Sequence, residues 1–159
     1  MIDKQVTPVT RLCAGIGSLF GVGHTPLMPG SAACLAAAGA FFLLKDSLAF
    51  SVLTAVSLVL AYLVSGAAER FYGKKDDKHI VIDDFSGQLV TYLGFAFTPQ
   101  ILVSGFFLFR MFDMLKVPPA DRLEGLGGSR GIVGDDVVAG IWANLILHLS
   151  FFLVRCFKG

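Results

Sequence analysis

Long uncharged segments alternate with short polar connectors along this chain. The first uncharged segment runs from Leu12 to Leu44, and His24 is its only ionisable side chain apart from the thiols. Gly and Pro residues interrupt its middle, in G-V-G-H-T-P-L-M-P-G-S, so one continuous helix is excluded. Ser31 stands where it can N-cap a helix through the second half. We therefore expect a broken or re-entrant pair of apolar helices around a Gly/Pro loop.

Three to four further helices are expected after this pair. The segment from Leu48 to Ala68 is uncharged and has roughly the 20 residues that a membrane span needs. Pro99 divides the next uncharged run into helices over 85–97 and 99–115, and the prolines at 118 and 119 end the second. Residues 120–134 are polar and Gly-rich and predict a loop. The last helix is expected to begin at Asp135 or Asp136 and to end near residue 157.

The composition places these helices in a membrane. Hydrophobic residues make up 55% of the 159 positions and charged residues only 16%, whereas soluble domains average about 25% charged residues. We predict an all-α fold, a small integral-membrane helical bundle that forms a single domain over residues 1–159. The net charge of +1 argues against nucleic acid as a partner. The three cysteines lack metal-type spacing, so neither a disulfide nor a zinc site is assigned.

Basic residues predict the topology, because cytoplasmic loops carry the excess of Lys and Arg. They cluster in the connector before the third apolar run and in the stretch before the last helix, at Lys74, Lys75, Lys78, Arg122 and Arg130. Both connectors are therefore expected to face the cytoplasm.

Two Asp pairs are the main candidates for chemistry. Asp83-Asp84 opens one uncharged run, in I-V-I-D-D-F-S-G, and Asp135-Asp136 opens another, in G-I-V-G-D-D-V-V-A-G. A carboxylate beside a low-dielectric region needs compensation. Helix capping is the simpler alternative, but adjacent helical residues point about 100° apart, so capping accounts for one Asp of each pair. We favour convergence of all four on a hard divalent cation such as Mg²⁺. Glu69, at the end of an apolar helix, is either an interface anchor or a further ligand.

Two other elements offer groups for binding phosphate. Arg110, Asp113 and Lys116 follow one another at spacings of three and share a helix face. They form either a salt-bridge ladder at a membrane interface or a phosphate clamp, with Asp113 orienting a cation or joining the metal shell. The Gly/Pro loop is either a simple turn or a phosphate cradle that ends at Gly30 and Ser31.

These elements together suit hydrolysis of a phosphate on a lipid head group, where a metal activates water and neutralises phosphate charge. Two other classes stay open: a small membrane transport or ion-binding subunit, and a non-catalytic lipid-binding protein. Transport would place the acids near helix midpoints. Asn144 and His148, four apart on the last helix, are expected to bond helix to helix rather than to do chemistry.

The chain resembles the bacterial phosphatidylglycerophosphatase A family from about Leu12 to His148. Four segments carry the resemblance in order: G-V-G-H-T-P-L-M-P-G-S, G-K-K-D-D-K-H-I-V-I-D-D-F-S-G, F-R-M-F-D-M-L-K-V-P-P and G-I-V-G-D-D-V-V-A-G-I-W-A-N. The resemblance implies Mg²⁺-dependent conversion of phosphatidylglycerophosphate to phosphatidylglycerol. It also implies a multi-pass protein of the bacterial inner membrane, with its active site facing the cytoplasm. A homodimer that buries part of the apolar surface is an open alternative.

The resemblance also implies roles for single residues. The expected catalytic residues are Asp83, Asp84 and Asp136. The expected metal ligands are Asp83, Asp84, Asp135 and Asp136, with Glu69 as a further candidate. The expected substrate-binding residues are Arg110, Lys116, Asp113, Gly30 and Ser31. The chain departs from the family after Gly30, where Ser31-Ala32-Ala33-Cys34 replaces the usual Thr-x-Gly-Ser and removes a glycine and a hydroxyl beside the expected cradle.

Overall fold

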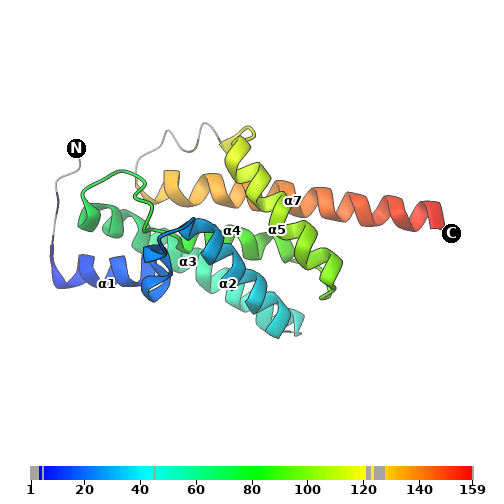
Figure 1. Ribbon diagram of the computed structural model, residues 1–159, viewed down its shortest axis with the longest axis horizontal. Coiled ribbons are helices and arrows are strands. Elements are labelled where there is room, and N and C mark those ends of the chain that lie inside the picture. The colour runs from blue at the N-terminus through cyan, green and yellow to red at the C-terminus, as the bar shows by residue number, and fades with distance from the viewer. Residues whose placement is uncertain (1–3, 5, 45, 121–122, 124–127, 159) are drawn as a thin grey trace.

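A computed structural model describes residues 4, 6–44, 46–120, 123 and 128–158. The regular elements in these ranges are all helical, which confirms the all-α prediction (Figure 1). They are α1 (Pro8–Gly17), the 3₁₀ helix η1 (Leu19–His24), α2 (Pro29–Leu43), α3 (Ser47–Tyr72), α4 (Ile82–Tyr92), α5 (Pro99–Leu115) and α7 (Ser129–Lys158). The broken pair expected at the N-terminus is α1 and α2, separated by η1.

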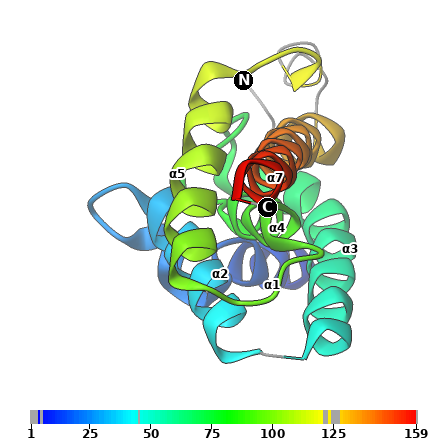
Figure 2. The ribbon, with the colours of Figure 1, turned by 90° about the vertical axis from the view of Figure 1, so that its right-hand side faces the viewer.

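The short helix α4 forms the centre of the bundle. Nine of its 11 residues are buried, and it packs against α2, α3, α5 and α7. Figure 2 shows this arrangement end-on, with α7 above α4 and with α5 and α3 on either side. A polar side chain on α4 is therefore surrounded by neighbouring helices and needs a partner inside the protein.

Helices α4 and α7 approach closely because Gly87 on α4 and Gly140 on α7 each lie against the backbone of the other helix. A Cβ at Gly87 would lie 2.7 Å from the carbonyl oxygen of Asp136 and 2.7 Å from Cε2 of Phe109. Further along, Asn144 Nδ2 donates to the carbonyl oxygens of Thr91 at 3.0 Å and Leu93 at 2.8 Å. The expectation that Asn144 bonds helix to helix is confirmed.

Two helices are long and apolar enough to cross a membrane, Ser47–Tyr72 and Ser129–Phe157. Their outward side chains are more than half exposed in the isolated chain, as at Leu63 on α3 and Phe152 on α7. Such surfaces are stable when hydrocarbon covers them. The arrangement fits a small helical membrane protein.

Two expected helix starts are wrong. Helix α7 begins at Ser129 and not at the Asp pair, so Asp135 and Asp136 lie in its second turn and cap nothing. Packing overrides the weak helix propensity of the glycines here, and Ser129 Oγ accepts a hydrogen bond from the backbone N–H of Gly66 at 2.8 Å. Helix α2 begins at Pro29, after Met28 in a left-handed conformation, and Ser31 is already inside its first turn. Arg122, counted among the cytoplasmic cations, lies outside the described residues.

Candidate active site

One cavity gathers most of the ionisable residues expected to act together. Its volume is about 430 Å³, and it lies where the start of α2, the connector before α4, the start of α4, the end of α5 and the second turn of α7 meet. Its lining comprises Met28, Pro29, Gly30, Asp76, Lys78, Ile80, Asp83, Asp84, Arg110, Asp113, Lys116, Ile132, Asp135 and Asp136.

Three carboxylates converge at this cavity. Asp83 and Asp84 occupy the first turn of α4, and Asp136 reaches them from α7. Each offers one oxygen, and the three oxygens lie within 4.8 Å of one another. Asp83 and Asp136 are only 5% exposed. Among the described residues neither of these two forms an ion pair, so two of the three carboxylates are buried without a basic partner.

Burial opposes ionisation of the two α4 acids. It raises the pKa of Asp84 to about 7, although Arg110 beside it favours the charged form. Burial, followed by the charge of Asp84, raises the pKa of Asp83 well above its usual range. A divalent cation would stabilise the charged forms, and carboxylate oxygens are among the ligands that bind Mg²⁺.

The basic residues pair with acids at the edge of the cluster. Arg110 Nη1 lies 2.5 Å from Asp84 Oδ1 and 2.8 Å from Asp113 Oδ2. Lys116 lies just past the end of α5 with a φ of 47°, and its Nζ is 3.3 Å from Asp135 Oδ2. Asp135 thus lines the cavity, but its carboxylate pairs with Lys116 and is not one of the three that converge.

Gly30 and Ser31 were both expected to bind substrate, but they differ in their position relative to the cavity. Gly30 lines the cavity, and a Cβ there would lie 2.5 Å from Asp84 Oδ2. Ser31 is half-buried and does not line the cavity.

Glu69, the candidate fifth metal ligand, is buried away from the cavity lining. Its Oε1 accepts a hydrogen bond from the backbone N–H of Asp76 at 3.1 Å. This contact gives Glu69 a structural partner in the connector between α3 and α4.

Three further residues at the site were not among the expected catalytic, metal-binding or substrate-binding residues. Asp76 and Lys78 line the cavity from the connector. Cys34 is fully buried, with Sγ 3.9 Å from Arg110 Nη1 and 3.9 Å from the carbonyl oxygen of Asp84. The two charged residues had a signal, because they lie in the polar connector that leads to Asp83, whereas a lone Cys in an apolar run has none.

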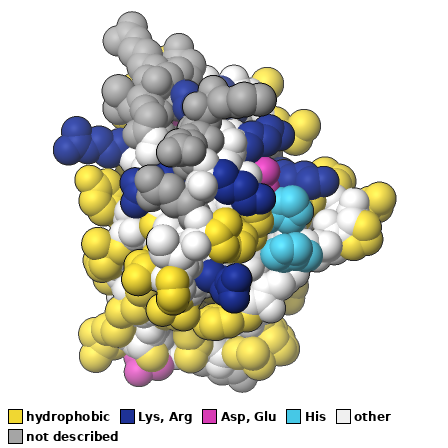
Figure 3. Space-filling view, turned by 90° about the vertical axis from the view of Figure 1, so that its left-hand side faces the viewer, with side chains coloured by type: hydrophobic (Ala, Val, Ile, Leu, Met, Phe, Trp, Pro, Cys, Tyr) yellow, Lys and Arg dark blue, Asp and Glu magenta, His cyan; other side chains and the backbone are white. Residues whose placement is uncertain are grey.

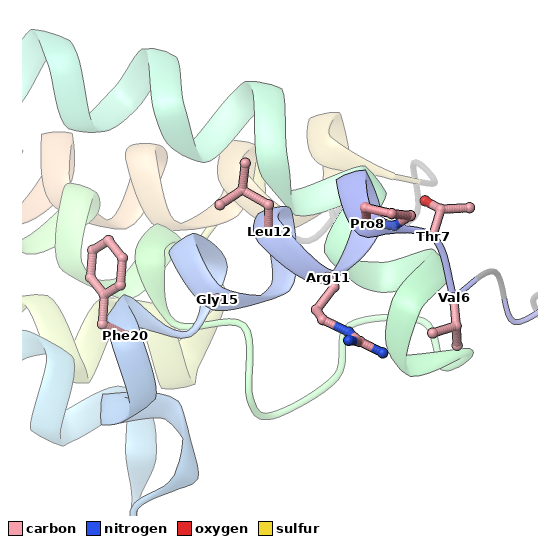
Figure 4. Close-up of a pocket in the computed structure, with 7 residues that line it drawn as sticks. All are labelled: Val6, Thr7, Pro8, Arg11, Leu12, Gly15 and Phe20. Atoms are coloured by element: carbon pink, nitrogen blue, oxygen red, sulfur yellow. The ribbon is translucent and has the colours of Figure 1, made fainter.

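A second hollow of about 490 Å³ has a different character. It runs along α1, between Val6 at one end and Phe20 at the other (Figure 4), and Arg11 is the charged residue among its described lining residues. The described residues that line it include no carboxylate. Among the described residues, the three converging carboxylates lie at the acidic cavity and not at this hollow.

The chain is similar to known proteins over most of its length. The family model of phosphatidylglycerophosphatase A matches residues 15–151. A phosphatidylglycerophosphatase A of Escherichia coli is 29% identical over 149 residues, covering 91% of this chain and 84% of that protein. The same enzyme of Haemophilus influenzae is 30% identical over 147 residues, covering 89% and 88%.

A third relative carries another name. A Bacteroides thetaiotaomicron protein named "Putative phosphatidylinositol-3-phosphatase" is 28% identical over 149 residues, covering 87% of this chain and 93% of that protein. No solved structure matches the chain. The family match includes every residue that lines the acidic cavity, from Met28 to Asp136. The chain therefore belongs to the phosphatidylglycerophosphatase A family and is a lipid phosphatase.

Proposed function

We propose that the protein hydrolyses the terminal phosphomonoester of phosphatidylglycerophosphate, giving phosphatidylglycerol and inorganic phosphate, with Mg²⁺ as its cofactor. The observation that carries the proposal is the convergence of three carboxylates beside Arg110, in a cavity between helices of a membrane protein. The names of the E. coli and H. influenzae relatives support this substrate.

Asp83, Asp84 and Asp136 would hold the Mg²⁺ ion. Their oxygens are close enough for one cation, and the burial of Asp83 and Asp136 makes an uncompensated charge there unfavourable. When bound, Mg²⁺ would supply charge neutralisation at the phosphate and a more acidic water molecule. Glu69 is not needed for this ligand set.

The remaining polar groups would bind and orient the phosphate. Arg110 is held by Asp84 and Asp113, and a guanidinium has five N–H donors, so it can also donate to substrate oxygens. Lys116, anchored by Asp135, would place a second positive charge at the same end of the cavity. One carboxylate of the Asp cluster would take the proton of the attacking water.

The position of the acids favours hydrolysis over transport. A transport subunit would hold its carboxylates near the midpoints of spanning helices, but these lie in the first turn of α4 and the second turn of α7. Non-catalytic lipid binding leaves the buried carboxylates unexplained, because acids repel a lipid phosphate unless a cation joins them.

We place the protein in the bacterial inner membrane, with α3 and α7 as spans and the cavity toward the cytoplasm. Lys and Arg side chains gather on the face at the α1 end of the molecule (Figure 3), as expected for a cytoplasmic side. The described cations of the connector and of the start of α7 include Lys74, Lys75, Lys78 and Arg130.

Crosslinking in membranes would test whether the protein forms a homodimer through its exposed apolar helices.

Phosphate release by the purified protein tests the function. The substrates are phosphatidylglycerophosphate, phosphatidylinositol 3-phosphate and phosphatidic acid in the same detergent micelles, each with Mg²⁺ or with EDTA. We expect Mg²⁺-dependent release that is fastest with phosphatidylglycerophosphate. Faster release from phosphatidylinositol 3-phosphate would transfer the assignment to that lipid, and full activity in EDTA would overturn the metal site.

A further inference from the structure

The connector between α3 and α4, residues 73–81, is fixed to the rest of the protein at several points. The buried Glu69 accepts from the backbone N–H of Asp76 at 3.1 Å. At the other end, the backbone N–H of Val81 donates to the carbonyl oxygen of Gly17 at 2.9 Å. This polar connector is therefore tied to both α3 and α1.

His79 anchors the middle of the connector. Its ring pairs with the carboxylate of Asp77, which also accepts from the His79 backbone N–H at 3.1 Å. The same ring lies 5.1 Å from the ring of Tyr72, nearly parallel to it, and 4.8 Å from the ring of His24. A Cβ at Gly23 would come within 2.9 Å of the His79 carbonyl carbon, so η1 packs directly on this backbone. The two histidines thus hold the connector against η1.

These contacts fix the backbone on both sides of Lys78, whose exposed side chain lines the acidic cavity. Its neighbours in the chain are the buried Asp77 and the half-buried His79. Arg110 and Lys116 pair with carboxylates of the cavity, whereas Lys78 forms no ion pair with any residue in the described ranges. Its positive charge is available to an anion that enters from the side of the connector.

The proposed substrate carries a second anion that needs such a partner. Phosphatidylglycerophosphate has the phosphomonoester that is hydrolysed and, across one glycerol, the phosphodiester that joins the head group to the diacylglycerol. With the monoester at the Asp cluster and Arg110, the diester would lie elsewhere along the lining, where Lys78 has no ion-pair partner among the described residues. We propose that Lys78 binds this phosphodiester and is a specificity-determining residue that favours lipids with two phosphates. The inference rests on the proposed function.

Two lipids separate this role from general attraction of anions. Phosphatidic acid has a phosphomonoester and no phosphodiester, and the product phosphatidylglycerol has the diester alone. In Lys78→Met we expect kcat/KM for phosphatidylglycerophosphate to fall about tenfold, mainly through KM, as for the loss of one charge-assisted hydrogen bond. Inhibition by phosphatidylglycerol should weaken by a similar factor. Turnover of phosphatidic acid and inhibition by inorganic phosphate should stay as in the wild type.

The matched control is Lys74→Met, because Lys74 is exposed like Lys78 and lies on the same connector but does not line the cavity. This variant should change none of these values. Lys78→Arg should keep most of the wild-type preference. Equal losses on both lipid substrates, or unchanged inhibition by phosphatidylglycerol in Lys78→Met, would overturn the assignment. A wild-type protein that releases no phosphate from phosphatidylglycerophosphate would instead refute the proposed function.

Discussion

Arg110 and Asp84 form an ion pair between α5 and α4, with Nη1 of the arginine 2.5 Å from Oδ1 of the aspartate. Both side chains are less than one-fifth exposed. The charged face that the sequence predicts on α5 therefore has an ion-pair partner on another helix, α4. The residue proposed to bind phosphate also stabilises a buried carboxylate.

Replacing Arg110 should therefore affect stability as well as activity. Arg110→Met leaves Asp84 without its ion-pair partner, and we expect the free energy of unfolding to fall by about 2–3 kcal/mol. The double variant Arg110→Met/Asp84→Asn should regain part of that loss, since Asp113 still lacks its partner, and should stay inactive. Thermal unfolding in detergent and phosphate release measure the two effects. A double variant that is as unstable as the single one would show that the ion pair is not what stabilises the site.

Asp136 tests the metal site from the α7 side. In Asp136→Asn, one of three converging carboxylates is lost, so Mg²⁺ should no longer raise the unfolding temperature and phosphate release should fall about 100-fold or more. Stability in EDTA should be retained or increased, because a buried charge is removed.

The control for this variant is Asp46→Asn at the N-cap of α3, where Asn caps equally well. It should keep both the activity and the response to Mg²⁺. Wild-type release of phosphate by Asp136→Asn would exclude the three-carboxylate site.

Local patterns were sufficient to predict much of the fold. Pro99 does begin α5, and the uncharged run from Leu48 does form α3. The start of α7 was missed because Gly131 and Gly134 suggest a loop, whereas packing against α4 and the bond from Gly66 to Ser129 sustain a helix. Helix propensity describes a segment in isolation, whereas contacts with other segments determine where α7 begins.

At the candidate site too, local patterns predicted some residues, whereas contacts between helices decided the rest. The Asp pairs and Arg110 were found because charges are rare in apolar runs. Their partners were not predictable, since the pairing of Asp84 with Arg110 and of Asp135 with Lys116 depends on how three helices meet. Lys116 illustrates this limit. Its backbone is left-handed and ends α5, so its side chain leaves the helical face that it was expected to share with Arg110.

Gly30 is predicted to be required for the shape of the site. In Gly30→Ala the new Cβ would lie 2.5 Å from Asp84 Oδ2, so the carboxylate must move away from the cluster. We expect phosphate release to fall at least about tenfold, since small displacements of positioned groups have large effects on rate. Gly39→Ala on the same helix meets nothing within 4 Å and should keep activity while stabilising α2 by about 0.5–1 kcal/mol. Equal activity of the two variants would contradict a tight fit at Gly30.

Gln88 is predicted to limit the stability of the bundle. It is completely buried on α4, and neither atom of its amide has a hydrogen-bond partner among the described residues. Gln88→Met keeps the length of the side chain and removes the polar group, so the free energy of unfolding should rise by about 1–2 kcal/mol with little change in activity. Gln100→Met, at an exposed position on α5, should leave the unfolding temperature unchanged. A loss of stability in Gln88→Met would instead show that the amide is solvated inside the bundle, one turn beyond Asp84.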